Sequence, residues 1–131
     1  VDAARESFDF LGYRFDRGRK FVRPKSMQKV KDTLREKTRR TDGRSLSCII
    51  TDLNRTLRGW FGYFKHAYKN TFPAVDGWVR GRLRSVLRKR QGRRGRGRGA
   101  DHQRWPNAYF HEHGLFSLKA AHDSARQSSS R

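Results

Sequence analysis

Segment 46–68 constrains the fold of this chain most strongly, because its apolar residues recur at intervals of three and four. They are Leu46, Ile49, Ile50, Leu53, Leu57, Trp60, Phe61 and Phe64. This spacing predicts an amphipathic helix, which is stable only when other elements cover its apolar face. Ser45 is suited to cap its first turn. Gly59 and Gly62 each cost a helix about 1 kcal/mol relative to alanine, so we expect another element to approach closely there.

Two further segments supply helical partners for this face. Residues 27–40 follow Ser26 as a candidate N-cap and place Met27, Val30, Leu34 and Thr38 on one side. Residues 74–90 place six side chains inward, namely Val75, Trp78, Val79, Leu83, Val86 and Leu87. We therefore predict a mainly α fold, a three-helix bundle. Cys48, the single cysteine, excludes an internal disulfide and is expected to be a buried thiol.

The regions outside the bundle predict smaller elements. Residues 8–15 and 20–23 flank the turn residues Asp16, Arg17 and Gly18, which predicts a short N-terminal β-hairpin. Residues 92–103 read as a flexible Arg/Gly-rich linker, and residues 104–131 as an aromatic C-terminal segment with a frayed tail. Within that segment, Ser117 is expected to cap a helix over 118–126. The expected divisions are 1–23, 24–91, 92–103 and 104–131.

The charge of the chain points to a polyanionic partner. Lysine and arginine total 32 against 12 acidic residues, a formal net charge of +20. This excess is larger than solubility requires. No stretch of 18 or more apolar residues and no secretion signal occurs, so neither a membrane span nor export is expected. We expect a nucleic acid, and RNA in particular, to be the partner.

The densest basic run predicts where that partner binds, because ten lysines or arginines and no acid lie between Gly77 and Ala100. Three arginines form an i, i+4, i+8 stripe that we expect opposite the apolar face of 74–90. Guanidinium forks on such a stripe suit phosphate oxygens, and a following Arg-Gly run can adapt to RNA. Candidate contacts from this run are Arg80, Arg84, Arg88, Lys89, Arg90, Arg93, Arg94, Arg96 and Arg98. Further candidates are Arg58 and Lys65 on 46–68, and Lys29 and Arg35 on 27–40, where Asp32 and Glu36 are available as pairing partners.

The sequence contains no recognisable catalytic or metal-binding motif. His111, Glu112 and His113 invite a metal-dependent nuclease interpretation, but histidines two residues apart cannot share one helix face. Asp52 and Asp123 have no second carboxylate at helical spacing, and no phosphate-binding loop is present. We expect no complete catalytic site, no metal and no cofactor, and keep a small metal-dependent nuclease as an alternative. An interaction module that docks through its hairpin and exposed aromatic residues is another.

Several motifs together resemble one family. Phe8-Asp9-Phe10-Leu11-Gly12-Tyr13-Arg14-Phe15 is similar to the strand pair that closes the palm of bacterial group II intron reverse transcriptases. Leu53-Asn54-x-x-Leu57-Arg58-Gly59-Trp60-x-x-Tyr63-Phe64 and Asp76-x-Trp78-Val79-x-x-Arg82-Leu83-Arg84 resemble their maturase-specific region, called domain X or thumb. Trp105-Pro106-Asn107-Ala108-Tyr109-Phe110 and His113-Gly114-Leu115-Phe116-Ser117-Leu118 resemble a C-terminal signature of bacterial members. The Arg-Gly run over 92–99 departs from the general pattern.

The resemblance implies a thumb-like bundle over 24–91, preceded over 1–23 by the end of the polymerase palm. It implies binding of group II intron RNA and stabilisation of its splicing-competent fold. It also implies a thumb that cradles the template–primer duplex of a parent RNA-directed DNA polymerase. The palm, with its Tyr-Ala-Asp-Asp site for Mg²⁺, is expected to lie outside this chain. The chain resembles the class of bacterial members that lack the endonuclease domain. A bacterial cytoplasmic ribonucleoprotein is the implied location, with the palm-docking module kept as an alternative.

Overall fold

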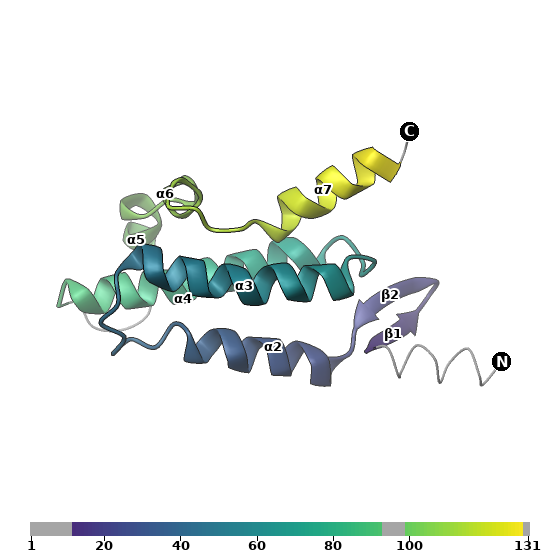
Figure 1. Cartoon of the computed structure of the whole chain (residues 1–131), viewed down its shortest axis with the longest axis horizontal. Coiled ribbons are helices and arrows are strands. Elements are labelled where there is room, and N and C mark those ends of the chain that lie inside the picture. The colour runs from purple at the N-terminus through teal and green to yellow at the C-terminus, as the bar shows by residue number, and fades with distance from the viewer. Residues whose placement is uncertain (1–11, 93–98, 130–131) are drawn as a thin grey trace.

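The structure is a computed structural model that describes residues 12–92 and 99–129 (Figure 1). These residues form six helices and one two-stranded antiparallel sheet, so the predicted mainly α fold with an N-terminal hairpin is confirmed. The long helices α2, α3 and α4 lie side by side, with the hairpin at one end (Figure 1). None of the helices within the described ranges is long and apolar enough to span a membrane.

Helix α2 (Pro24–Glu36) begins and ends earlier than its apolar pattern predicts. Pro24 occupies the first turn, where its missing N–H would be unpaired in any case. Ser26 is therefore inside the helix, and its predicted role as N-cap is wrong. At the other end, the Thr38 hydroxyl donates to the Leu34 carbonyl at 2.8 Å, the acceptor that a continuing helix needs for the Thr38 N–H. Val30, Leu34 and Thr38 are buried as expected.

Helix α3 (Leu46–Phe64) forms the centre of the core. Ser45 caps it by accepting a hydrogen bond from the backbone N–H of Cys48 at 3.2 Å, which confirms the predicted cap. The helix buries most of its predicted apolar face, namely Ile49, Ile50, Leu53, Leu57, Trp60 and Phe64. Cys48 falls outside that arc and is exposed, so the prediction of a buried thiol is wrong. Among the described residues, no neighbouring atom would lie within 4 Å of a Cβ at Gly59 or Gly62, so the expected close approach of another element is not found there.

Helix α4 (Thr71–Arg90) starts three residues before the predicted position. Pro73 lies within its first turn, where proline is tolerated, and the extra turn buries Phe72. Val75, Val79, Leu83 and Val86 are buried as predicted. Trp78 and Leu87, which were expected inside, are only partly buried at the edge of the core.

The hairpin joins β1 (Tyr13–Asp16) to β2 (Arg19–Val22) and packs on the end of α3. Arg17 and Gly18 both have positive φ, 53° and 79°, which suits a two-residue hairpin turn. Tyr13 is buried edge-on against Phe64, with ring centroids 5.4 Å apart. The predicted hairpin is confirmed over the described strands, whereas residues 8–11 of its expected first strand lie outside the described residues.

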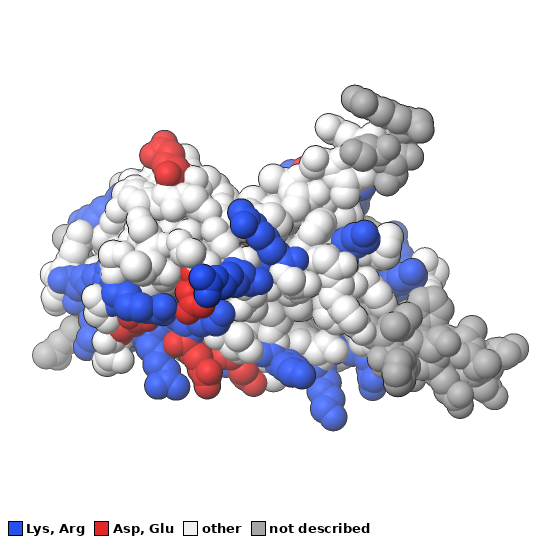
Figure 2. All heavy atoms as spheres, viewed as in Figure 1, with Lys and Arg blue, Asp and Glu red and all other residues white. Residues whose placement is uncertain are grey.

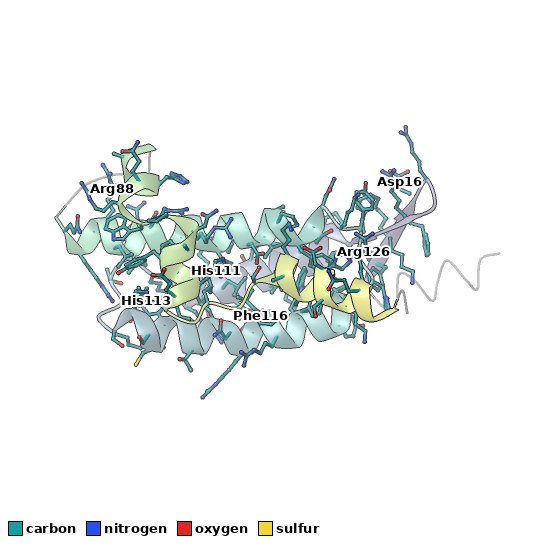
Figure 3. The ribbon with its side chains drawn as sticks, turned by 90° about the horizontal axis from the view of Figure 1, so that it is seen from above. Asp16, Arg88, His111, His113, Phe116 and Arg126 are labelled. Carbon is teal, nitrogen blue, oxygen red and sulfur yellow. The ribbon has the colours of Figure 1, made fainter. Side chains whose placement is uncertain are left out.

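The C-terminal segment contributes more of the core than the predicted three-helix bundle allows. It contains α5 (Gly99–Arg104), α6 (Asn107–Glu112) and α7 (Leu118–Ser129). Its apolar side chains belong to the same core as the long helices, namely Trp105, Phe110, Leu115 and Leu118. Helix α5 occupies the end of the stretch expected to be a linker, whose residues 93–98 lie outside the described part. Viewed from above, α6, the loop through Phe116 and α7 lie across α3 and α4 (Figure 3).

Polar side chains of the long helices fasten this segment in place. The Asn54 amide of α3 donates to the Gly114 carbonyl and accepts from the Phe116 N–H, both at 2.8 Å. The Asp76 carboxylate of α4 accepts from the backbone N–H groups of Leu118 and Lys119, both at 3.0 Å. These groups belong to the first turn of α7, which has no intrahelical partner for them. Helices α3 and α4 therefore each supply a side chain that binds the backbone of the C-terminal segment.

Candidate nucleic-acid interface

The sequence predicted that the arginine stripe of α4 faces solvent, but the structure shows that it does not. Arg84 is only 2% exposed. Its Nε donates to the Trp105 carbonyl and its Nη2 to the Asn107 side chain, both at 2.9 Å. Burial lowers the pKa of Arg84, repulsion from Arg80 lowers it further, and Asp101 opposes both effects. The expectation that Arg84 lies opposite the core is wrong, because the segment of α5 and α6 covers that side of α4.

Arg88, the next arginine of the stripe, contacts the same segment. Arg88 forms an ion pair of 2.9 Å with Asp101 of α5, whose side chain is fully buried. Arg104 lies 3.7 Å from the other oxygen of the same carboxylate. Arg80 is half-buried, and its Nε has no hydrogen-bond partner among the described residues. Arg84 and Arg88 thus hold α5 and α6 against α4.

The last basic residues of α4 have separate environments. Arg90 donates from Nη2 to the Asp42 carbonyl at 3.1 Å and also to the Arg44 carbonyl. It thereby holds the turn between α2 and α3, where hydrogen bonds from Arg44 lower the pKa of Asp42. Lys89 is exposed, and within the described residues its side-chain ammonium has no hydrogen-bond or ion-pair partner. Lys89 therefore remains available for a ligand, whereas Arg90 has a structural role.

The remaining candidates are spread over several surfaces. Arg58 is exposed on α3 and lies over the Phe116 ring at 5.4 Å, and Lys65 is exposed just beyond the same helix. Lys29 and Arg35 are exposed on α2, where Arg35 pairs with Asp32 at 2.8 Å. On the face that α2 and α3 present, the acidic side chains in view lie mostly on the half away from the hairpin (Figure 2). Four candidates in the chain between α4 and α5 lie outside the described residues, namely Arg93, Arg94, Arg96 and Arg98.

A hollow of about 440 Å³ gathers basic side chains between α2, α4 and α5. We call it the α2–α4 hollow. Its lining contains no carboxylate and consists of Arg35, Arg40, Trp78, Gly81, Arg82, Arg84, Ser85 and His102. Of the residues predicted to bind RNA and described in the structure, Arg35 and Arg84 line it, and Arg84 is engaged beneath it. The hollow joins residues more than 60 positions apart in the chain, which is why sequence spacing did not reveal it.

Some polar side chains of the α2–α4 hollow have hydrogen-bond partners within the protein, and others have none. Arg82 donates to the Thr38 hydroxyl at 3.1 Å and to the Thr38 carbonyl at 3.0 Å, and so closes the end of α2. Burial lowers the pKa of Arg82, and the positive charges of Arg35 and Arg40 lower it further. Within the described part of the chain, the side chains of Arg40, Ser85 and His102 have no hydrogen-bond or ion-pair partner. These three side chains leave unused polar groups on a cationic wall.

An aromatic ring lies at the edge of the same hollow. Trp78 is partly buried, with Lys31 Nζ at 5.5 Å and Arg35 Cζ at 5.6 Å from its ring centroid. Cations over a tryptophan face are stabilised by its quadrupole, by about 0.5–1 kcal/mol at exposed sites. The combination of an accessible aromatic ring and unpaired cations is typical of surfaces that bind nucleic acids.

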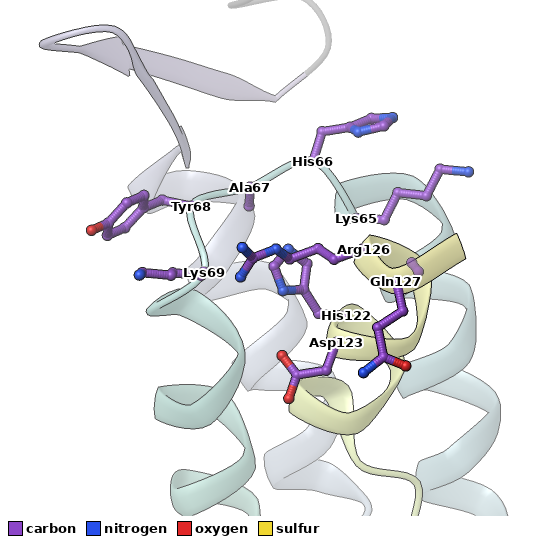
Figure 4. A pocket seen from close by; sticks show the side chains of 10 residues that line it. Lys65, His66, Ala67, Tyr68, Lys69, His122, Asp123, Arg126 and Gln127 are labelled. Atoms are coloured by element: carbon purple, nitrogen blue, oxygen red, sulfur yellow. The ribbon is translucent and has the colours of Figure 1, made fainter. Parts of the chain in front are cut away.

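A second hollow lies at the opposite end of the molecule, between the turn after α3 and helix α7. Lys65, His66 and Lys69 line one side, and His122 and Arg126 the other (Figure 4). His122 stacks on Phe72 at 4.6 Å. Burial lowers the pKa of His122, and Arg126 lowers it further, against the opposing effect of Asp123. Lys65 is the one predicted RNA contact in this hollow. Tyr68 also lines it, with Arg19 Cζ 4.5 Å from its ring centroid, but unlike the α2–α4 hollow its lining contains a carboxylate, that of Asp123.

The residues of the nuclease alternative do not form a metal site. Nδ1 of His111 is 3.2 Å from the Leu115 carbonyl, and Nδ1 of His113 is 2.7 Å from the Tyr109 carbonyl. The two imidazoles are thus engaged with different backbone carbonyls on α6 and the loop after it (Figure 3). Across residues 12–92 and 99–129, no group of three or more potential metal-ligating side chains is found.

Comparison with known protein families gives one match. The model of the group II intron maturase-specific domain matches residues 27–105. This chain belongs to that family. The match runs from Met27 in α2 to Trp105 after α5, so the maturase-specific domain includes the three long helices and the α2–α4 hollow. No curated protein matches the chain.

Several residues that line the α2–α4 hollow were not predicted as RNA contacts from the sequence. Trp78 was expected in the core, Arg82 was noted only within a motif, and neither Arg40 nor His102 was proposed as a contact. Helical periodicity places Trp78 beside the apolar face but does not tell whether the bundle covers it. The absence of any acid between Gly77 and Ala100 was the available signal, and this stretch supplies five residues of the hollow's lining, namely Trp78, Gly81, Arg82, Arg84 and Ser85.

Proposed function

We propose that this maturase-specific domain binds group II intron RNA and stabilises its splicing-competent fold. The α2–α4 hollow is the observation that carries the proposal, because it concentrates arginines without a lining carboxylate. Desolvation and mutual repulsion make such a cluster costly for the isolated protein, as the lowered pKa of Arg82 indicates. A phosphate placed there would offset that repulsion and form charge-assisted hydrogen bonds.

This function requires no bond chemistry from the domain. A protein that binds the folded intron better than its open forms shifts the RNA population toward the folded state. A shift from 1:99 to 99:1 requires about 5.5 kcal/mol of differential binding. A few charge-assisted contacts, at about 1.5–3 kcal/mol each, supply that amount. The intron RNA itself then provides the splicing chemistry.

The wider setting is part of the same proposal. In a parent RNA-directed DNA polymerase, α2, α3 and α4 would form the thumb beside a palm that holds Mg²⁺ and a template–primer duplex. The domain would need no cofactor of its own and would act in a cytoplasmic ribonucleoprotein. The family match and the three-helix arrangement support this placement.

A second candidate function is docking on a polymerase palm. Phe15 of the hairpin is 45% exposed, and Tyr63 near the end of α3 is 55% exposed. Both lie on elements at the hairpin end of the bundle, where the chain continues into residues 1–11. An apolar contact with a palm at this end is compatible with RNA binding at the α2–α4 hollow. Docking through apolar side chains would change little with salt, unlike binding to phosphates.

The decisive experiment compares two charge reversals, Arg40→Glu and Arg55→Glu. Both side chains are exposed without a partner among the described residues, and Arg55 lies on α3 outside the hollow. We expect Arg40→Glu to weaken binding to group II intron RNA about tenfold or more, as removal of a charge-assisted phosphate interaction does. The slope of log K against log salt should become less negative by about 0.9 for each duplex phosphate that the variant no longer neutralises. Splicing assistance should fall in parallel.

Arg55→Glu is the matched control, since it changes the net charge equally. We expect it to have a much smaller effect, while circular dichroism shows both variants folded. Equal losses of affinity for the two variants would mean that net charge, not the hollow, determines binding. Binding of intron RNA no tighter than of length-matched duplex DNA at physiological salt would reject RNA specificity altogether.

A further inference from the structure

Trp78 differs from the other tryptophans of the domain in what surrounds it. Trp60 and Trp105 are 8% and 5% exposed, within the core, whereas Trp78 is partly exposed at the rim of the α2–α4 hollow. No described residue accepts a hydrogen bond from its indole N–H. An indole that needed only to fill core volume would gain nothing from this position. Its ring and its N–H are instead both accessible to a ligand in the hollow.

The cations over the Trp78 ring are held loosely. Lys31 and Arg35 lie 5.5 Å and 5.6 Å from the ring centroid, near the outer limit of about 6 Å for a cation–π contact. Arg35 also pairs with exposed Asp32, a type of surface contact worth about 0–1 kcal/mol. A planar group entering the hollow can therefore displace them from the ring at small cost. The displaced cations would remain close enough to bind its phosphate.

The hollow also contains unused polar groups suited to the other parts of a nucleotide. Arg82 and Arg84 already donate to protein acceptors, so neither is free to rearrange. Arg40 has no partner among the described residues and contributes to the repulsion that lowers the pKa of Arg82. Ser85 and His102 have hydroxyl and imidazole groups with no described partner. Phosphate on Arg40 would leave these two groups to bind a sugar or a base edge.

Resting on the proposed RNA binding, we infer that the α2–α4 hollow binds one unpaired nucleotide of the RNA. The base stacks on Trp78, and Arg40 binds its phosphate. The volume of about 440 Å³ is within the range of pockets for small molecules, about 300–1,000 Å³. A base paired inside a helix has both faces covered by its neighbours. Only a nucleotide from a loop, bulge or single strand can therefore offer a face to Trp78.

Variants at Trp78 test the stacking contact directly. Trp78→Phe keeps an aromatic face, whereas Trp78→Leu keeps an apolar side chain without one. With a single-stranded oligouridylate as probe, we expect Trp78→Leu to weaken binding about five- to 150-fold, the effect of losing one base stack. Trp78→Phe should retain most of the affinity. Binding of a blunt RNA duplex of the same length should change little in either variant.

Fluorescence supplies a second measurement that does not depend on a substitution being tolerated. Trp78 is the tryptophan within reach of a ligand, so stacking of uracil should quench wild-type emission and the duplex should not. Equal affinities of the Phe and Leu variants for the oligouridylate, or binding without quenching, would overturn the inference while RNA binding itself stands. If the domain bound neither intron RNA nor the oligouridylate, the proposed function and this inference would both fail.

Discussion

The guanidinium of Arg84 donates to the Trp105 carbonyl and the Asn107 side chain, and the Phe110 ring lies 5.3 Å from it. Nothing in the spacing of Arg80, Arg84 and Arg88 distinguishes this environment from a solvated stripe. Arg84 is buried because the later part of the chain, including α6, folds back over α4. An arginine in such a position binds protein carbonyls and is not available to phosphate.

Substitution of Arg84 should therefore affect stability. We predict that Arg84→Ala lowers the free energy of unfolding by about 2–4 kcal/mol, since two acceptors lose a charged donor in a buried setting. The free energy is measurable by urea denaturation followed by circular dichroism. Lys89→Ala, at an exposed position of the same helix, should change it by less than about 0.5 kcal/mol. Similar values for the two variants would contradict the structural role of Arg84.

At the scale of elements, α7 depends on a residue from another helix. Asp76 of α4 accepts from the N–H groups of Leu118 and Lys119, while the Ser117 hydroxyl accepts from the Ala120 N–H at 3.1 Å. The predicted cap at Ser117 is confirmed, but it satisfies only part of the first turn. A carboxylate also interacts favourably with the positive end of the helix dipole. The position of α7 is thus determined jointly by its own cap and by α4.

Removal of the Asp76 carboxylate should release α7. We predict that Asp76→Ala destabilises the domain by about 2–4 kcal/mol, because it leaves buried N–H groups unpaired. Hydrogen exchange in residues 118–127 should accelerate more than in α2. The comparison is Asp123→Ala, which removes a carboxylate that pairs with Lys119 on the surface of α7. Surface pairs contribute about 0–1 kcal/mol, so protection of α7 in that variant should be nearly unchanged.

For the molecule as a whole, the net charge of +20 opposes folding by self-repulsion. Salt screens that repulsion, and it also weakens exposed ion pairs such as Arg35–Asp32. The repulsion involves many more charges than the described ion pairs contain. We therefore expect screening of the repulsion to dominate, even without RNA.

The thermal midpoint should accordingly rise with salt. Raising NaCl from about 0.1 M to about 1 M shortens the Debye length from about 10 Å to about 3 Å. We predict an increase in Tm, measured by calorimetry, and a smaller increase for the double variant Arg55→Glu/Lys89→Glu, which carries less net charge. A Tm that falls as NaCl is added would show that ion pairs outweigh the repulsion.

Sequence alone determined the local features of this domain. Apolar periodicity predicted α3 and the inner face of α4, and Ser45 and Ser117 were recognised as caps, since these features depend on neighbours within a few residues. The predicted boundaries of α2 were less accurate, because single residues determine where the helix begins and ends. Pro24 starts it early, and the Thr38 hydroxyl takes the Leu34 carbonyl that a longer helix would need. The charge excess and the motifs were sufficient to indicate the family, because neither depends on how the chain packs.

Tertiary structure alone decided how the polar residues are used. Asn54, Asp76 and Arg84 belong to recognisable motifs, yet their partners lie more than 20 positions away in the chain, so periodicity could not identify them. The same long-range packing buries Arg84, leaves Cys48 and Trp78 accessible, and joins Arg40 to His102 across the α2–α4 hollow. Net charge is a sum over residues and can be read from the sequence. Which cations remain free for a ligand depends on which of them the folded chain has already paired.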